Sequence, residues 1–311
     1  MYAVWENFVS GLRRVPPDAP FGKLADQYVH IESGAVYEYA GKIGKGRYGR
    51  VDAYRCSATN TPCPNQFAVK SMCGNAEHEI LAIHALSAIS TVHPKAGGFV
   101  QAAILRESGD GSADVAMPVY NGDLCAFSNA CTSRFAVRAT LSVSMTARAL
   151  WRSGLAYCDV KTSNVLYHSK NNENHVVLGD LGSIVLRRSH DGSHATGIFT
   201  FPPRRSVDTC GIVVPIEEDI VWGLGTLLMT LTLGVGWVAH RLTADALQLR
   251  CAGDLEAAFI AADADVRAAA DEMRAEKGAF GVKAANALLI ALDAWAELES
   301  ASLTAFCDVL R

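Results

Sequence analysis

The chain has 311 residues, of which half are hydrophobic and 19% are charged. This composition is typical of a folded globular protein and excludes an intrinsically disordered one. The formal net charge of -4 provides no bulk positive field, so we expect no specific nucleic-acid partner.

The N-terminal stretch MYAVWENFVSGLRR has no continuous apolar run and no cleavage site, so it does not resemble a secretory signal. Its apolar residues fall on one helical face: Val4, Trp5, Phe8, Val9 and Leu12. We expect residues 1–35 to form an extension whose helix packs on the following domain. A membrane-surface anchor is the less favoured alternative.

Residues 36–120 predict a small lobe that is rich in strands. The strand patterns cover 36–56 and 66–72, a helical pattern covers 76–90, and further short strands are expected at 100–120.

Helices dominate residues 121–311, which we expect to form a larger lobe. The helical stretches are 134–153, 220–233, 243–262, 264–276 and 281–309. Strands followed by helices indicate an α+β fold.

One stretch, Val221 to Ala239, carries no charged residue and is as long as a membrane span. Glycines interrupt it, and the acidic residues Glu217, Glu218 and Asp219 precede it. A helix buried in a large lobe has the same composition, so we expect no membrane span.

The segment GKIGKGRYGRV contains the pattern Gly44-x-Gly46-x-x-Gly49, followed by Val51. Glycines without side chains let backbone N–H groups approach a phosphate closely. Any glycine hairpin can match this pattern. A dinucleotide-binding loop would open a helix, whereas a strand pattern follows here.

A lysine ends the apolar strand Ala68-Val69-Lys70, where it could place a compact positive charge on a phosphate. A carboxylate on the following helix would orient it. We favour Glu79 over Glu77, because Glu79 shares a helical face with the apolar residues that follow. Either glutamate could instead be an ordinary solvated helix residue.

The segment YCDVKTSNVL supplies Asp159, Lys161 and Asn164, and an apolar strand further on ends in Asp180-Leu181-Gly182. A carboxylate can orient a hydroxyl proton, a lysine can neutralise a migrating phosphoryl group, and an amide can hold a metal ion. A second carboxylate suits Mg²⁺, which favours oxygen ligands. Each motif alone could be a surface turn, but their order and spacing together argue for one site.

Together these motifs resemble the eukaryotic-type protein kinase family over residues 36–240. The resemblance implies a bilobal fold with a small antiparallel-sheet lobe that carries one helix and a larger, mainly helical lobe. It also implies ATP and Mg²⁺ as cofactors and proteins bearing Ser or Thr as substrates. The hinge-like segment AMPVYNGDL is loosely similar to the corresponding segment of herpesvirus-type kinases.

The resemblance also assigns roles. Gly44, Gly46 and Gly49 would cover the ATP phosphates, and Lys70 would pair with Glu79. Val51 and Ala68 would lie above the adenine, Leu166 below it, and Met117 to Val119 would form the hinge. Asp159 would be the catalytic base and Lys161 the phosphate-neutralising lysine, with Asn164 and Asp180 as the Mg²⁺ ligands.

Several positions depart from the family pattern. Tyr157 and Cys158 replace His-Arg, which removes the usual anchor for a phosphorylated activation loop and predicts activity that is independent of such phosphorylation. Pro202-Pro203-Arg204 replaces Ala-Pro-Glu, so the usual buried Glu–Arg pair cannot form. The sequence leaves open whether Thr196 or Thr200 reaches Asp159. It also leaves open the structural role of Asp219, which precedes Trp222 by one residue more than is usual in the family.

These departures keep two alternatives open: a non-catalytic ATP-binding scaffold on the same fold, and a small-molecule phosphotransferase. Lys161 argues against the second. Nine cysteines, an odd number without a C-x-x-C motif, indicate reduced thiols in a cytoplasmic or nuclear compartment.

Overall fold

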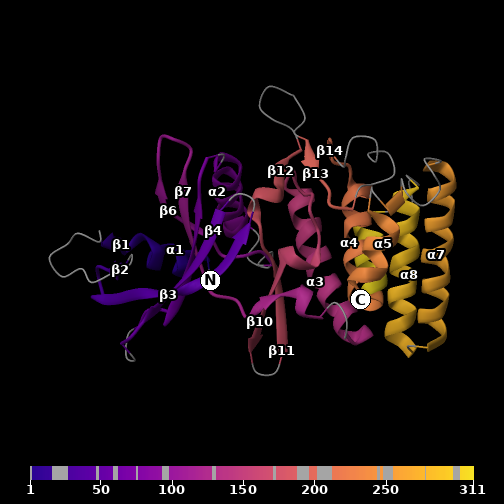
Figure 1. Cartoon of the computed structure of the whole chain (residues 1–311), viewed down its shortest axis with the longest axis horizontal. Helices are drawn as coiled ribbons and strands as arrows, with labels where there is room; N and C mark the ends of the chain where they lie inside the picture. Colours follow the sequence, from indigo (N-terminus) through magenta and orange to yellow (C-terminus); the bar gives the residue numbers. More distant parts are fainter. Residues whose placement is uncertain are drawn as a thin grey trace. The chain divides into compact units, whose positions relative to one another are not determined.

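The computed structural model describes residues 2–15, 27–46, 49–58, 62–74, 76–92, 98–127, 131–170, 173–187, 196–201, 212–243, 246–247, 255–276, 278–296 and 302–311. The chain divides into two compact units, Met1–Pro94 with Val100–Tyr120 and Lys95–Phe99 with Asn121–Arg311. The first unit holds the large sheet and the second holds most of the helices (Figure 1). An antiparallel sheet followed by a mainly helical region confirms the predicted α+β class.

The first unit is built on a seven-stranded antiparallel sheet. Its strands follow the spatial order β1 (Leu12–Val15), β2 (Gln27–His30), β3 (Ala35–Gly46), β4 (Gly49–Cys56), β5 (Gln66–Met72), β7 (Ala113–Met117) and β6 (Ala103–Glu107). The β3–β4 pairing is irregular at two places, which twists and bends a long hairpin.

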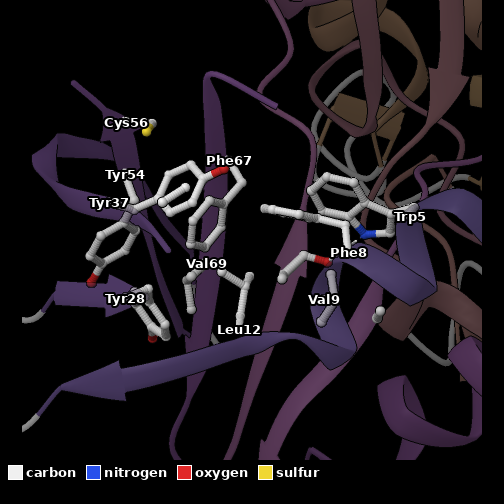
Figure 2. Close-up of a cluster of buried hydrophobic side chains, with 13 residues drawn as sticks. Trp5, Phe8, Val9, Leu12, Tyr28, Tyr37, Tyr54, Cys56, Phe67 and Val69 are labelled. Carbon is white, nitrogen blue, oxygen red and sulfur yellow. Dashed lines mark hydrogen bonds between the residues drawn. The ribbon is translucent and has the colours of Figure 1, made fainter. Parts of the chain in front are cut away.

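Helix α1 (Tyr2–Ser10) packs its apolar face into an aromatic core of this unit (Figure 2). Phe8 contacts the rings of Tyr37 and Phe67 edge-on, at centroid distances of 5.8 Å each. The indole N–H of Trp5 donates to the carbonyl of Ala116 on β7. One assignment was wrong: Leu12 begins strand β1, because α1 ends at Ser10, although Leu12 is still buried in the same core.

Helix α2 (Glu77–Val92) begins with two acidic residues, Glu77 and Glu79. Negative charge in the first turn is favourable because unpaired backbone N–H groups point that way. Ile80, Ile83 and Leu86 are buried, as their helical spacing predicted.

Three small sheets lie in the second unit. They pair β11 (Glu173–Leu178) with β10 (Val165–Lys170) and β8 (Gly122–Asp123), β12 (Ile184–Leu186) with β9 (Leu155–Tyr157), and β13 (Gly197–Ile198) with β14 (Ile212–Val213). The helices described here are α3 (Ser133–Arg152), α4 (Glu217–Leu233), α5 (Val235–Leu242), α7 (Leu255–Glu276), α8 (Gly278–Trp295) and α9 (Leu303–Leu310).

Helix α4 is the centre of the second unit. Trp222 is fully buried and stacks on Trp295 of α8 at 4.8 Å between ring centroids. A Cβ on Gly225 would lie 2.2 Å from Cβ of Ala291, so the glycine lets α4 and α8 approach closely. In the part of the chain that is described, no helix is long and apolar enough to cross a membrane.

The helix boundaries differ from the expectation near the C-terminus. Residues 281–309 hold two helices, α8 and α9, whereas 255–276 is one continuous helix. Part of the expected helix over 243–262 lies outside the described residues, and so do Pro202, Pro203, Arg204, Cys210 and Cys251.

Candidate active site

The glycine-rich segment forms the end of the β3–β4 hairpin in the first unit. Gly44 pairs with Val51 and Gly46 pairs with Gly49 across the two strands. A Cβ on Gly49 would lie 2.4 Å from the carbonyl oxygen of Ser71 on β5. Gly49 therefore has a packing reason to lack a side chain, in addition to the phosphate role that the resemblance implies.

Lys70 and Glu79 form an ion pair within the first unit. Lys70 lies on β5, and its ammonium group donates to Oε2 of Glu79 at 2.6 Å. The two side chains are 15% and 7% exposed, so solvent screens this pair less than a surface pair. Glu77 is exposed, so Glu79 is the glutamate that meets this lysine.

The positions expected to border an adenine lie on several strands. Ala68 is buried and pairs with Met117 on β7, and Val51 on β4 pairs with Lys70. Val119 follows β7 in irregular backbone. Leu166 lies on β10 in the second unit, opposite Asp123.

Asp159 is held by three neighbours, all in the second unit. Its Oδ1 accepts hydrogen bonds from the hydroxyl of Thr200 at 2.6 Å and from the Thr200 backbone N–H at 3.2 Å. Its Oδ2 accepts from the ammonium of Lys161 and from the side-chain amide of Asn164. Thr200, rather than Thr196, is therefore the threonine that reaches this carboxylate. The ammonium group of Lys161 also donates to the Thr200 hydroxyl at 3.1 Å.

Asn164 and Asp180 are linked through the backbone between them. The Gly179 N–H donates to the carbonyl of Asn164 at 2.7 Å. Asp180 has φ 42° and ψ 70°, and among the described residues it is the only non-glycine with positive φ. This conformation is uncommon for a side-chain-bearing residue and is typical of positions that the surrounding fold holds for a function.

Tyr157 lies beside this backbone. Its ring is 1% exposed, and its hydroxyl donates to the carbonyl of Gly179 at 2.8 Å. Burial raises the pKa of Tyr157 well above its usual value, and the charges of Asp180 and Asp159 raise it further. The hydroxyl is therefore a permanent donor at neutral pH. The sequence showed the replacement of histidine but not this contact, which links residues far apart along the chain.

Cys158 packs directly against the strand that leads to Thr200. A Cβ on Gly197 of β13 would lie 2.2 Å from the Cys158 sulfur. Burial raises the pKa of the Cys158 thiol, with contributions from the carboxylates of Asp219 and Asp159. The thiol is therefore neutral and a poor nucleophile.

Asp219 is buried at the start of α4, where Oδ2 accepts the Ile216 N–H at 2.8 Å. This hydrogen bond gives Asp219 a structural role at the first turn of α4.

The donor set of the second unit suits a magnesium–phosphate complex. Asn164 and Asp180 would supply one amide and one carboxylate oxygen. Mg²⁺ is commonly held by one or two protein ligands with substrate phosphates completing its shell. The part of the chain that the structure describes has no group of three or more His, Cys, Asp and Glu side chains able to hold a metal alone.

The antiparallel sheet followed by the helical region matches a protein kinase-like fold. Among solved structures that match, one is described as vaccinia related kinase 3. The TM-score is 0.53 at 11% sequence identity, over 79% of this chain and 77% of that chain. Such a likeness shows the fold alone. No protein-family model and no curated protein sequence matches the chain.

Proposed function

We propose that this protein is a serine/threonine protein kinase that transfers the γ-phosphoryl group of ATP to hydroxyl groups of protein substrates. The observation that carries the proposal is the environment of Asp159, whose carboxylate is oriented by Thr200, Lys161 and Asn164. A fixed carboxylate beside an ammonium group matches what phosphoryl transfer to a hydroxyl requires.

The chemistry follows from these groups. Asp159 accepts the proton of the substrate hydroxyl while the new O–P bond forms and the bond from the γ-phosphorus to the bridging oxygen of ADP breaks. Lys161, next to Asp159, offsets negative charge on the migrating phosphoryl group. When bound, Mg²⁺ supplies further charge neutralisation, and Asn164 and Asp180 would hold it.

In the first unit, the Lys70–Glu79 pair presents an oriented ammonium group for the phosphates of ATP. The glycines of the β3–β4 hairpin are proposed to cover the same phosphates.

The same proposal includes activity without phosphorylation of the activation loop. Cys158 contacts Gly197 directly, β13 pairs with β14, and Thr200 is bonded to Asp159. These contacts hold Gly197 and Thr200 in place, and position 158 carries no basic side chain that could bind a phosphate.

A cytoplasmic or nuclear location is also part of the proposal. It is supported by the free thiols that the described residues contain, which include Cys56, Cys158 and Cys307.

Phosphate transfer to a generic basic protein with Mg²⁺ and ATP tests the proposal. Asp159→Asn keeps the size of the side chain but removes its ability to accept a proton as a base, so we expect the rate to fall about 10²- to 10⁴-fold. Asp308→Asn is the matched control, because Asp308 is an exposed residue paired with Arg311 on the surface.

Three outcomes would contradict the kinase proposal. Equal rates for wild type and Asp159→Asn would remove Asp159 from the reaction. Binding of ATP with no transfer by wild type would favour the non-catalytic scaffold, for which the loss of arginine at position 158 is the supporting observation. Transfer to small alcohols but not to proteins would favour a small-molecule phosphotransferase.

A further inference from the structure

Helix α3 carries a row of four arginines on its solvent-facing side: Arg134, Arg138, Arg148 and Arg152. Because each residue of a helix is rotated by about 100° from the one before it, the four positions fall within about 80° of one another around the helix axis. Three of the side chains are exposed and that of Arg148 is half-buried. The opposite side of α3 packs against α4, α8, α9, β9 and β11.

Two apolar residues lie on the same side of α3, between the first and the second pair of arginines. Met145 is 44% exposed, although it is a large hydrophobic residue, and Leu141 is half-buried. From Arg134 to Arg152 the row is about 27 Å long, because a helix rises about 1.5 Å per residue. We call the four arginines together with Leu141 and Met145 the arginine stripe.

The positive charges of the arginine stripe have no counter-charge within α3, whose sequence contains no acidic residue. Among the residues that the structure describes, no carboxylate forms an ion pair with any of the four arginines, and the Arg134 guanidinium lies over the ring of Phe280, 6.0 Å from its centroid. Arginines on other elements do pair with aspartates: Arg106 with Asp114, Arg241 with Asp265 and Arg267 with Asp263.

The energetics of the helix itself oppose this arrangement. Arg134 and Arg138 are four residues apart, and so are Arg148 and Arg152, so like charges lie one turn apart and repel each other. Arg134 also stands in the first turn, where the unpaired backbone N–H groups disfavour a positive charge, whereas Arg152 in the last turn is placed favourably. Stabilisation of α3 therefore does not account for the arginine stripe, and binding of an anionic partner does.

The residue types of the arginine stripe favour a protein partner. All basic residues of α3 are arginines, whose planar group binds a carboxylate through two parallel hydrogen bonds. Arginine and methionine are enriched in protein–protein interfaces, where an apolar centre is surrounded by polar residues. A nucleic-acid backbone would place phosphates along the apolar centre as well. A helix that lies on a membrane buries its apolar side in the lipid, whereas the apolar side of α3 is buried in the second unit.

We propose that the arginine stripe binds an acidic segment of a partner protein. The carboxylates of this segment pair with the arginines at the two ends of the stripe, and its central apolar side chains cover Leu141 and Met145. This binding goes beyond phosphoryl transfer and does not depend on it, so it is measured without ATP.

A fluorescently labelled peptide of about 20 residues, which is about 30 Å long as a helix, serves as the probe. It carries glutamates towards both ends and leucines on one helical face in the centre. Its binding to the whole chain is followed by fluorescence anisotropy. The variant combines Arg138→Gln with Arg152→Gln, because both side chains are exposed and glutamine is nearly as good a helix former as arginine.

The matched control combines Arg267→Gln with Arg274→Gln. These arginines lie on α7 in the same unit, and each pairs with an aspartate of α7, so the net charge of the protein changes by the same amount. We expect the α3 variant to bind the peptide about 10-fold more weakly or worse, and the α7 variant to bind it within about twofold of wild type.

Three further measurements on the wild-type protein need no variant. Added NaCl screens exposed charges, so we expect it to weaken binding of the peptide. A second peptide, with serines in place of the central leucines, should bind more weakly because it cannot cover Leu141 and Met145. A single-stranded oligonucleotide with the same number of charges and vesicles that contain phosphatidylserine should both bind more weakly than the first peptide.

Several outcomes would overturn the proposal. No binding of the acidic peptide to wild type, or binding that NaCl leaves unchanged, would remove the stripe as an anion-binding surface. Equal losses in the α3 and α7 variants would assign the binding to the net charge of the protein. Tighter binding of the oligonucleotide or of the vesicles would replace the protein partner by a nucleic acid or a membrane, and equal binding of the two peptides would exclude the apolar contact.

Discussion

At position 158 a small neutral side chain fills the space next to the segment that carries Thr200. Because a Cβ on Gly197 would meet the Cys158 sulfur at 2.2 Å, a longer side chain here would have to displace β13. Order in this segment thus comes from close packing and from the Thr200–Asp159 bonds. An arginine–phosphate pair, which depends on modification, has no counterpart at this position.

We therefore expect phosphatase treatment of the purified protein to leave its transfer activity within about twofold. The physical reason is that β13 packs on Cys158 and that Thr200 is hydrogen-bonded to Asp159. The measurement compares initial rates before and after treatment, with mass spectrometry to verify that phosphate has been removed. A loss of activity that returns on incubation with ATP would contradict the prediction.

Some of the site residues could be predicted from the sequence, and some of their contacts could not. Asp159, Lys161 and Asn164 could be singled out because their roles follow from residue type and close spacing. The contact of Tyr157 with Gly179 could not, since it joins β9 to a loop 22 residues away and depends on how the chain returns. The link between Lys70 and Glu79 was accessible because helical periodicity indicated which glutamate faces inward.

Among the elements, those with strong periodicity were the predictable ones. Strands β3, β4 and β5 and helices α2 and α3 follow patterns of apolar residues, and the structure contains them near the expected bounds. Strands β1 and β2 were missed because they are short, and LRRV and QYVH bury few apolar residues. Pairing with β3 stabilises them, and such pairing leaves no local signal.

Helix α1 adds a packed layer to the sheet. Trp5, Phe8 and Val9 are buried against Phe67 and Val69 of β5 (Figure 2). Side chains alternate between the faces of a strand, so α1 covers the face opposite the one to which Lys70 belongs. A second contact, from the Ser87 hydroxyl to the carboxylate of Glu6, joins α1 to α2.

For this element we expect Trp5→Ala to lower the free energy of unfolding of the first unit by about 3–5 kcal/mol. The change removes the buried ring and leaves the Ala116 carbonyl without its indole donor. Chemical denaturation measures the decrease in the free energy of unfolding, and hydrogen exchange of the amides in β5 and β7 assigns it to the first unit. The control is Leu81→Ala on α2, because Leu81 is 57% exposed and should change stability by less than about 0.5 kcal/mol. Similar effects of the two changes would refute the role of α1.

On the scale of the whole molecule, the proposed function draws on groups from both units: Lys70 and Glu79 belong to the first, and Asp159, Asn164 and Asp180 to the second. Phosphoryl transfer is catalysed mainly by positioned charges. If these groups act in one reaction, the effect on kcat/KM of changing one group depends on whether the other is present. If the two units have separate activities, the two effects are independent.

A double-mutant cycle of Lys70→Met and Asp180→Asn distinguishes these cases. We expect each single change to lower kcat/KM by about 10²-fold or more. We expect the double variant to be little less active than the less active of the two single variants, because the effects of groups that act as a unit are strongly non-additive. Lys42→Met serves as the control, since Lys42 is an exposed lysine on β3 and should leave kcat/KM unchanged. Fully additive losses would mean that Lys70 and Asp180 contribute independently to kcat/KM, and the expected coupling would then be wrong.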